Sequence, residues 1–349
     1  MADTDDFAPD DKPLRRGWTT GACATAAAKS ALAALTGGQF EDPVTITLPG
    51  GQTPAFALAH EARGEGWAEA GIIKDAGDDP DVTHGALVIA RVAPGASGGG
   101  VTFHAGPGVG MVTKPGLPIP PGEPAINPVP RKMINEALGG GDYSVTVGVR
   151  DGEALAAKTW NPRLGIMGGL SILGTTGIVV PYSCAAWIAS IQRGVDVARA
   201  MGLSHVVGAT GDASEKAAVA RLRLAVEAYL DMGDFVGGLL KYVKRHPVQR
   251  VTIAGGFAKM VKLAQGAMDL HSARGAVDFE VLAELLPEEL RERARGANTA
   301  NEVLGIGGTA LANEVARLAR ERAQAIVGEA ARVDVLVVDR AGTIVGESG

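Results

Sequence analysis

Two different hydrophobic periodicities divide this chain, and they constrain its fold more than any other feature. In the first half, short runs alternate apolar and polar residues and are bounded by Gly, Pro and Asp. This period of two is typical of mostly antiparallel strands. The runs cover 44–48, 55–61, 67–75, 84–92, 101–106 and 143–149, after an Ala-rich helical pattern over 15–38. We therefore predict an α+β domain over residues 14–165.

The second half alternates apolar strand patterns with long helical patterns. HVVGATG (205–211) leads into SEKAAVARLRLAVEAYL, VTIAGG (251–256) leads into FAKMVKLAQGAMDL, and VDVLVVD (333–339) is a late strand. Apolar strand, Gly turn and helix is the order found in parallel βαβ units. The sequence thus predicts an α/β domain over 166–349 with a mostly parallel, Rossmann-like sheet. A length of 349 residues also favours two domains.

The leader and the charge exclude several classes of protein. Residues 1–13 are acidic and lack the basic and apolar regions of a signal peptide, so we predict a disordered leader on a cytoplasmic protein. No apolar run reaches the roughly 18 residues that span a membrane. A net charge of −6 without a basic block argues against nucleic acid as a partner. Cys23 and Cys184 have no CxxC partner, which predicts buried thiols rather than a disulfide or zinc site.

Three Gly-rich turns are candidate ligand sites: 169–183, 208–215 and 254–259. In parallel sheets ligands bind beyond the carboxyl ends of the strands, where such turns and helix N-termini offer free amides. The residues we single out for a cofactor are Gly174, Thr175, Thr176, Gly177, Gly208, Gly211 and Asp212. None of the turns matches GxGxxG followed by a distal acid, and each could equally be an ordinary left-handed turn.

The Ala-rich pattern RRGWTTGACATAAAKSALAALTGG (15–38) predicts a helix capped by Thr19 or Thr20 and stopped by Gly37. Its start could present amides and hydroxyls beside Arg15 and Arg16, which suits a carboxylate ligand. A tightly packed core helix is the simpler reading of the same residues.

Several longer motifs occur in a fixed order along the chain, and the resemblance that they carry spans about Leu14 to Val338. They are RRGWTTGACATAAAKSA, KDAGDDPDVTHG, GEPAINPVPRKMI, GIMGGLSILGTTGIVVPYS, ATGDASE, GDFVGGLL and KMVKLAQGAMDLHS. This series resembles the CbiD family, the cobalt-precorrin-5B (C1)-methyltransferases of cobalamin biosynthesis. The resemblance implies S-adenosylmethionine as methyl donor and methylation of C1 of cobalt-precorrin-5B to give cobalt-precorrin-6A. Cobalt would then enter only as part of the substrate ring, with no metal site on the protein.

The acceptor that the resemblance implies is an anionic tetrapyrrole, so its site needs local cations. Arginine suits bidentate grip of a carboxylate and lysine acts as a point charge. Seven cations fall in or beside the motifs: Arg15, Arg16, Lys74, Lys114, Arg131, Lys132 and Arg163. The residues we assign to substrate are Arg15, Arg16, Thr19, Thr20, Lys74 and Arg131.

The acidic segment KDAGDDPDVTHG (74–85) could be a metal cage, an acid/base group or a turn. Its register does not fit a calcium loop, and His84 beside carboxylates is more typical of a structural residue. We predict a loop at the domain interface in which Asp75 or Asp78 orients the ring or accepts its proton. Closely spaced carboxylates would raise the pKa of at least one of them.

Two other functions compete with methyl transfer. A nicotinamide-dependent oxidoreductase would use the parallel domain but lacks its fingerprint. A non-catalytic tetrapyrrole carrier would need the anion-binding cleft without a donor site. The sequence leaves open whether the acceptor carries cobalt, and a homodimer is only the default expectation.

Overall fold

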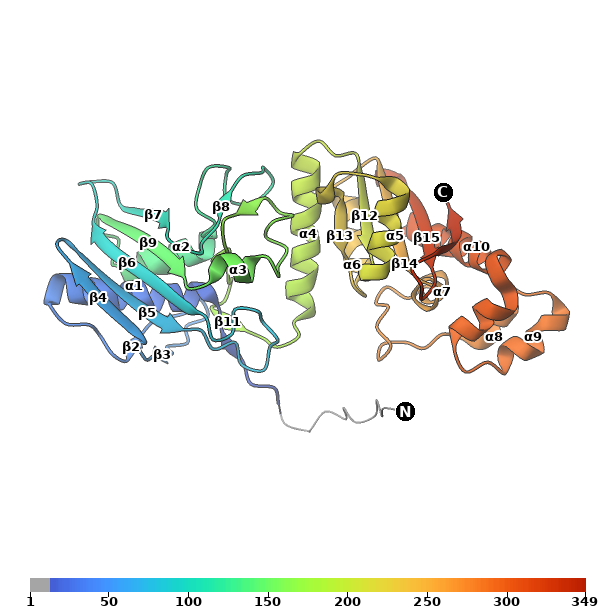
Figure 1. Cartoon of the computed structure of the whole chain (residues 1–349), viewed down its shortest axis with the longest axis horizontal. Helices are drawn as coiled ribbons and strands as arrows, with labels where there is room; N and C mark the ends of the chain where they lie inside the picture. The colour runs from blue at the N-terminus through green and yellow to red at the C-terminus, as the bar shows by residue number, and fades with distance from the viewer. Residues whose placement is uncertain (1–12) are drawn as a thin grey trace. The chain divides into compact units, whose positions relative to one another are not determined.

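The structure is a computed structural model that describes residues 13–349 (Figure 1). Nearly all of the predicted leader therefore lies outside the described residues. The chain separates into two compact units that divide between Ser183 and Cys184, with Pro115–Leu117 belonging to the second unit. Both units combine helices with sheets, so the mixed α and β content predicted for the two halves is confirmed.

The division of the chain differs from the predicted boundary at 165/166. Two short strands beyond that boundary pair with earlier ones: β10 (Ile166–Met167) with β8 (Met111–Val112), and β11 (Ile178–Val179) with β1 (Gly17–Trp18). Because these partners are distant in sequence, local periodicity gave no sign of the pairing. Residues 166–183 belong to the first unit for this reason.

The first unit is built on a five-stranded sheet with the order β4-β5-β6-β9-β7. Its pairings are antiparallel except between β7 and β9, which run parallel. The strands are β4 (His60–Gly64), β5 (Trp67–Ile73), β6 (Leu87–Pro94), β7 (Val101–Ala105) and β9 (Tyr143–Val149), with a separate pair β2 (Val44–Thr45) and β3 (Ala55–Phe56). The predicted runs over 44–48 and 55–61 thus form shorter strands than expected.

Helix α1 (Thr20–Gly37) packs across β5 and β6 (Figure 1). Thr19 caps it, since its hydroxyl accepts a hydrogen bond from the Ala22 amide, and Gly38 ends it with φ of 77°. The alanines along the helix are largely buried, because a methyl side chain lets the helix lie close to the sheet. Helix α2 (Pro128–Ala137) packs beside α1, and α3 (Gly152–Ala156) follows β9.

The second unit contains a five-stranded sheet with the order β13-β12-β14-β15-β16. The first four strands are parallel, and β16 is antiparallel to β15. The strands are β12 (His205–Ala209), β13 (Tyr229–Asp231), β14 (Arg250–Gly256), β15 (Arg332–Val338) and β16 (Ile344–Ser348). β14 and β15 are apolar and buried for most of their length, as expected for strands covered on both faces.

Helices surround this second sheet. They are α4 (Cys184–Ala200), α5 (Asp212–Leu222), α6 (Val236–Arg245), α7 (Phe257–Ala264), α8 (Phe279–Ala283), α9 (Glu288–Arg295) and α10 (Ala300–Val327), with 3-10 turns at Val226–Ala228 and Gly328–Ala330. The long helix predicted after β12 is wrong in its second half. The helix ends before Arg223, which has φ of 51°, and the chain then forms β13. A strand of three residues is too short to show a period of its own.

Candidate functional site

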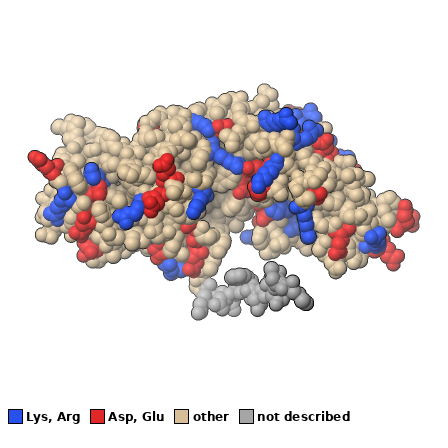
Figure 2. All heavy atoms as spheres, viewed as in Figure 1, with Lys and Arg blue, Asp and Glu red and all other residues tan. Residues whose placement is uncertain are grey.

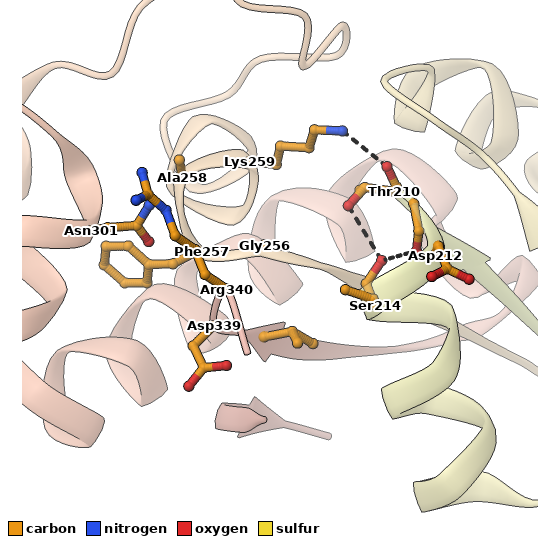
Figure 3. A pocket seen from close by; sticks show the side chains of 13 residues that line it. Thr210, Asp212, Ser214, Gly256, Phe257, Ala258, Lys259, Asn301, Asp339 and Arg340 are labelled. Atoms are coloured by element: carbon orange, nitrogen blue, oxygen red, sulfur yellow. Dashed lines mark hydrogen bonds between the residues drawn. The ribbon is translucent and has the colours of Figure 1, made fainter. Parts of the chain in front are cut away.

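A cavity of about 300 Å³ lies at the carboxyl edge of the second sheet (Figure 3). It is bounded by the residues that follow β12, β14 and β15 and by the starts of α5, α7 and α10. The lining residues are Thr210, Gly211, Asp212, Ala213, Ser214, Gly256, Phe257, Ala258, Lys259, Asn301, Val338, Asp339 and Arg340.

The strand order explains why the chain opens at this point. From β12 the chain continues to β13 on one side, whereas from β14 it continues to β15 on the other side. The connections therefore diverge between β12 and β14, which leaves a crevice beyond their carboxyl ends. Helices α5 and α7 begin there, so the partial positive charge at each helix start faces the crevice.

Lys259 links two walls of the cavity. Its Nζ donates a hydrogen bond to the Thr210 carbonyl oxygen at 2.9 Å and lies 3.1 Å from Oδ1 of Asp234. That oxygen is buried and has no partner with hydrogen-bond geometry, so we treat this second contact as an ion pair only. The lysine thus fixes the spacing between the ends of β12 and β14 and carries positive charge at the cavity.

Hydroxyl and carboxylate groups occupy the wall that α5 forms. Ser214 Oγ donates to the Gly211 carbonyl at 2.8 Å and lies 3.5 Å from Thr210 Oγ1. The carboxylate of Asp212 pairs with Lys216 at 2.7 Å, and both side chains are exposed. This wall can accept and donate hydrogen bonds to a polar ligand.

Two of the predicted cofactor residues, Gly211 and Asp212, line this cavity, but Gly208 does not. Gly208 lies within β12, where a Cβ atom would overlap the Leu239 side chain. Packing explains the glycine at this position, and its assignment to the cofactor stays a prediction. Sequence reasoning missed Asn301 and Arg340. Arg340 could have been found, since it directly follows the predicted strand 333–339.

The other predicted turn, 174–177, lies in the first unit. Gly174 and Gly177 have φ of 130° and 81°, and added Cβ atoms would overlap Thr19 and Leu48 respectively. These glycines are therefore needed for close packing of the loop. Thr175 and Thr176 are exposed between them, and Thr176 Oγ1 accepts a hydrogen bond from the Ile178 amide at 3.2 Å.

The start of α1 is closed by the same loop. Thr19 and Thr20 are 6% and 4% exposed, and the Thr20 hydroxyl accepts from the Leu173 amide at 3.1 Å. The Leu173 carbonyl in turn accepts from the Gly21 amide at 3.0 Å. Both threonines therefore have a role in capping and packing the helix start, and the substrate contacts expected for them stay a prediction. The packed core helix, which was the simpler alternative, is what the structure shows.

The aspartates of the acidic segment bind groups from other parts of the chain, and two of them share Arg15. Asp75 accepts from both terminal nitrogens of Arg15, one of them at 2.9 Å. Asp78 accepts from the Arg15 amide at 2.6 Å. Asp79 accepts from the amide of Tyr182 at 2.8 Å. The aspartates of this loop therefore bind partners that lie 60 to 103 positions away from them in the sequence.

The fourth aspartate, Asp81, pairs with Lys74 at 2.6 Å. The Lys74 side chain is 1% exposed and paired within the fold, and the substrate contact expected for it stays a prediction. A charged ammonium is tolerated in such a position only with a close anionic partner. Asp81 also accepts hydrogen bonds from the amide and hydroxyl of Thr83 at 2.8 and 2.6 Å, so the carboxylate is well satisfied.

The electrostatics of this loop differ from the expected general base. Hydrogen bonding from Arg15, and then from the Gly77 amide, lowers the pKa of Asp75 to about 2. Burial acts to raise the pKa of Asp81, but the charge and hydrogen bond of Lys74 outweigh it, so this pKa is also lowered. Among residues 13–349 there is no group of three potential metal ligands. Asp75 and Asp81 are therefore not the carboxylate whose pKa was expected to be raised.

The remaining cations differ in how many other groups of the protein they contact. The Arg131 guanidinium donates to the Ile126 and Pro124 carbonyls at 2.8 and 3.2 Å and pairs with Glu123 at 2.7 Å, which gives it a structural role. Lys132 is exposed beside Glu136. Arg16 is exposed and lies beside Gly77 in the backbone pairing. Figure 2 shows acidic and basic side chains interspersed over the visible face, so an anion must be bound by local cations.

The cysteines do not share one environment. Cys23 is buried in α1, and burial raises the pKa of its thiol to about 12. Cys184 is exposed, so the prediction of two buried thiols is wrong for this residue. Of the helices among the described residues, none combines the length and hydrophobicity that a membrane crossing requires.

The second unit is an α/β fold with a cavity at the carboxyl edge of its parallel sheet, the position at which such sheets bind small ligands. The family descriptions that match are CbiD, over residues 8–181, and CbiD, C-terminal domain, over residues 269–349. Two relatives named cobalt-precorrin-5B C(1)-methyltransferase match almost throughout. The protein of Rhodospirillum rubrum is 59% identical over 99% of this chain and 100% of its own length. That of Paramagnetospirillum magneticum is 57% identical over 97% and 99%. The chain belongs to the CbiD family.

A solved structure is also similar to this chain. It is the crystal structure of cobalamin biosynthesis protein CbiD from Archaeoglobus fulgidus, with 27% sequence identity over 75% of this chain and 83% of that one. The TM-score is 0.40.

Proposed function

We propose that this chain methylates C1 of cobalt-precorrin-5B, with S-adenosylmethionine as donor, to give cobalt-precorrin-6A in cobalamin biosynthesis. The observation that carries the proposal is the near full-length identity of 57–59% to relatives named for this reaction. The donor supplies a methyl group on a positively charged sulfur, which becomes a neutral thioether as the carbon–carbon bond forms. The protein's part is then to bind and align two ligands.

We place the donor in the cavity of the second unit, treating the sheet as a Rossmann-like one. In its strand order, β13 and β12 are exchanged and the other strands follow in sequence. Doubly wound folds that bind ligands at this edge have the same order. The lining combines the cations Lys259 and Arg340 with the carboxylates Asp212 and Asp339. That charge balance fits the ammonium and carboxylate of the donor's amino acid. Hydroxyls and an amide are present for its ribose and base.

Size is consistent with the same assignment. A volume of about 300 Å³ falls at the lower end of the range found for small-molecule sites, roughly 300–1,000 Å³. By contrast, the glycines of the 174–177 turn are explained by packing, Gly174 against Thr19 and Gly177 against Leu48. Its exposed threonines, Thr175 and Thr176, are the part of that turn still available to a ligand.

We place acceptor recognition in the first unit, at Arg15 and Arg16. Asp75 holds the Arg15 guanidinium from the side, and Asp78 holds its backbone. We propose that these two carboxylates orient the arginine for a substrate carboxylate instead of accepting a proton, because the lowered pKa of Asp75 makes it a weak base. Arg16 would meet the acceptor directly, since no carboxylate of the described residues pairs with it.

Calorimetric titration with S-adenosylhomocysteine, the product of methyl transfer, tests the proposal, with NAD as the control ligand. We expect micromolar binding of the first and none of the second. Lys259→Met should weaken binding about tenfold, as expected for loss of a charged contact. Lys216→Met is the matched control, because this lysine is exposed and does not line the cavity.

The two rival functions predict different results. Binding of NAD alone would support the oxidoreductase. Binding of the tetrapyrrole ring with no affinity for S-adenosylhomocysteine, before or after the ring is added, would support a carrier. Mass spectrometry of the ring after incubation with the donor then distinguishes a methyltransferase from both rivals, since methyl transfer raises the mass of the ring by one methyl group.

A further inference from the structure

Helix α10, whose first turn lines the cavity, is interrupted at one residue. Gly308 has φ of 58° and ψ of −153°, a combination that is essentially open only to glycine. An added Cβ atom there would meet no atom within 4 Å, so the backbone conformation alone demands the glycine. The kink separates a first segment, 300–307, from a longer segment, and α10 as a whole packs on α7, β15 and β16.

The first segment is fixed at its other end by a capping arrangement. Thr299 Oγ1 accepts from the Glu302 amide at 3.2 Å, and Glu302 Oε2 accepts from the Asn298 amide at 2.6 Å. Val303 is fully buried in the same core cluster as Leu286. The cap, this packing and the kink together determine where the first turn of α10 points.

That first turn carries Asn301 into the cavity. In Figure 3, Asn301 lies with Phe257 and Arg340 on the left of the cavity, whereas Thr210 and Ser214 lie on the right. Within residues 13–349 no group hydrogen-bonds its side-chain amide. An amide offers a donor and an acceptor on one planar edge. The polar edges of adenine present the complementary pair, an amino group beside a ring nitrogen.

We propose that Asn301 recognises the adenine of the methyl donor and that Gly308 is the positioning residue that brings it there. The kink turns the first segment of α10 toward the carboxyl edge of the sheet. A regular helix through residue 308 would direct that segment elsewhere. The inference rests on the proposed function, because it requires the donor in this cavity.

A double-mutant cycle on the full chain tests the coupling, with S-adenosylhomocysteine as the calorimetric probe. Asn301→Ala and Gly308→Ala should each weaken binding about tenfold, the loss expected for one good pair of hydrogen bonds. The double variant should bind no more weakly than either single one, because both changes remove the same contact. Gly305→Ala is the matched control: it lies in the same segment, has open space around it, and should leave affinity unchanged.

Additive losses in the double variant, or unchanged affinity in Asn301→Ala, would overturn the inference while the donor still bound. Absence of binding to the unmodified protein, with or without the ring, would instead remove the proposed donor and this inference with it. Should Gly308→Ala fail to fold, the role of Asn301 can be tested by hydrogen exchange of residues 300–307 in the unmodified protein and in Asn301→Ala. We expect S-adenosylhomocysteine to slow exchange there in the unmodified protein and not in Asn301→Ala, and equal exchange with and without ligand would refute the role of Asn301.

Discussion

Replacing Asp81 with asparagine should destabilise the first unit through the lysine that it pairs with. Lys74 Nζ lies 2.6 Å from Asp81 Oδ2, and the lysine side chain is 1% exposed. Removing the anion leaves a buried ammonium without a charge partner, which typically costs about 3–5 kcal/mol. Because the Asp81 side chain is 25% exposed, water can reach the gap, so we expect the lower value, about 3 kcal/mol.

Scanning calorimetry would measure this loss. For a unit of this size, about 2–4 °C of melting temperature is lost per kcal/mol, so we expect a fall of about 6–12 °C. Glu136→Gln is the matched control. It breaks the Lys132–Glu136 pair, which spans 3.8 Å between side chains that are 74% and 62% exposed, and it should cost well under about 1 kcal/mol.

Two further measurements separate a buried charge from lost packing. Combining Asp81→Asn with Lys74→Met removes both charges and should recover most of the stability. The pKa of Asp81 is lowered from its ordinary value of 3.8 in the folded state, so the pair's contribution is present at neutral pH and is lost as pH falls below that value. The difference from the unmodified protein should therefore shrink in acid. A melting temperature in Asp81→Asn no lower than in the control would refute the reasoning.

Three other predictions follow from local environments. Iodoacetamide should label Cys184 in the native protein and Cys23 only after unfolding, because Cys23 is buried with a pKa of about 12; mass spectrometry of peptides would show the order. Gly77→Ala should lower the urea midpoint strongly, since φ is 68° and a Cβ atom would overlap a carbonyl oxygen of the facing segment; an unchanged midpoint would contradict this. Burial, and then the charge of Arg250, lower the pKa of His205 below 6.5, so its neutral form favours folding. Stability should therefore be full above pH 6.5 and decline below it, and replacing His205 with asparagine should flatten that part of the pH profile measured by urea unfolding.

The sequence by itself determined the elements that have a clear period. The Ala-rich helix beginning after Thr19, the alternating strands of the first half and the apolar strands before Gly211 and Phe257 were all predicted within a few residues. Hydrophobic periodicity reports which face of a segment is buried, so it needs only neighbouring residues. The order of the motifs also led to the correct family, because it covers nearly the whole chain.

Only the tertiary structure decided what individual polar residues do. The acidic segment reads as a possible base, yet its carboxylates hold Arg15, Lys74 and Tyr182, which are distant or buried partners. The cavity of the second unit combines the ends of three strands with Asn301, about 90 residues beyond the first of those ends. Burial and partners of a charged group depend on contacts between segments far apart in sequence. Because those contacts set its pKa and its access to ligand, residue type and spacing alone do not determine its role.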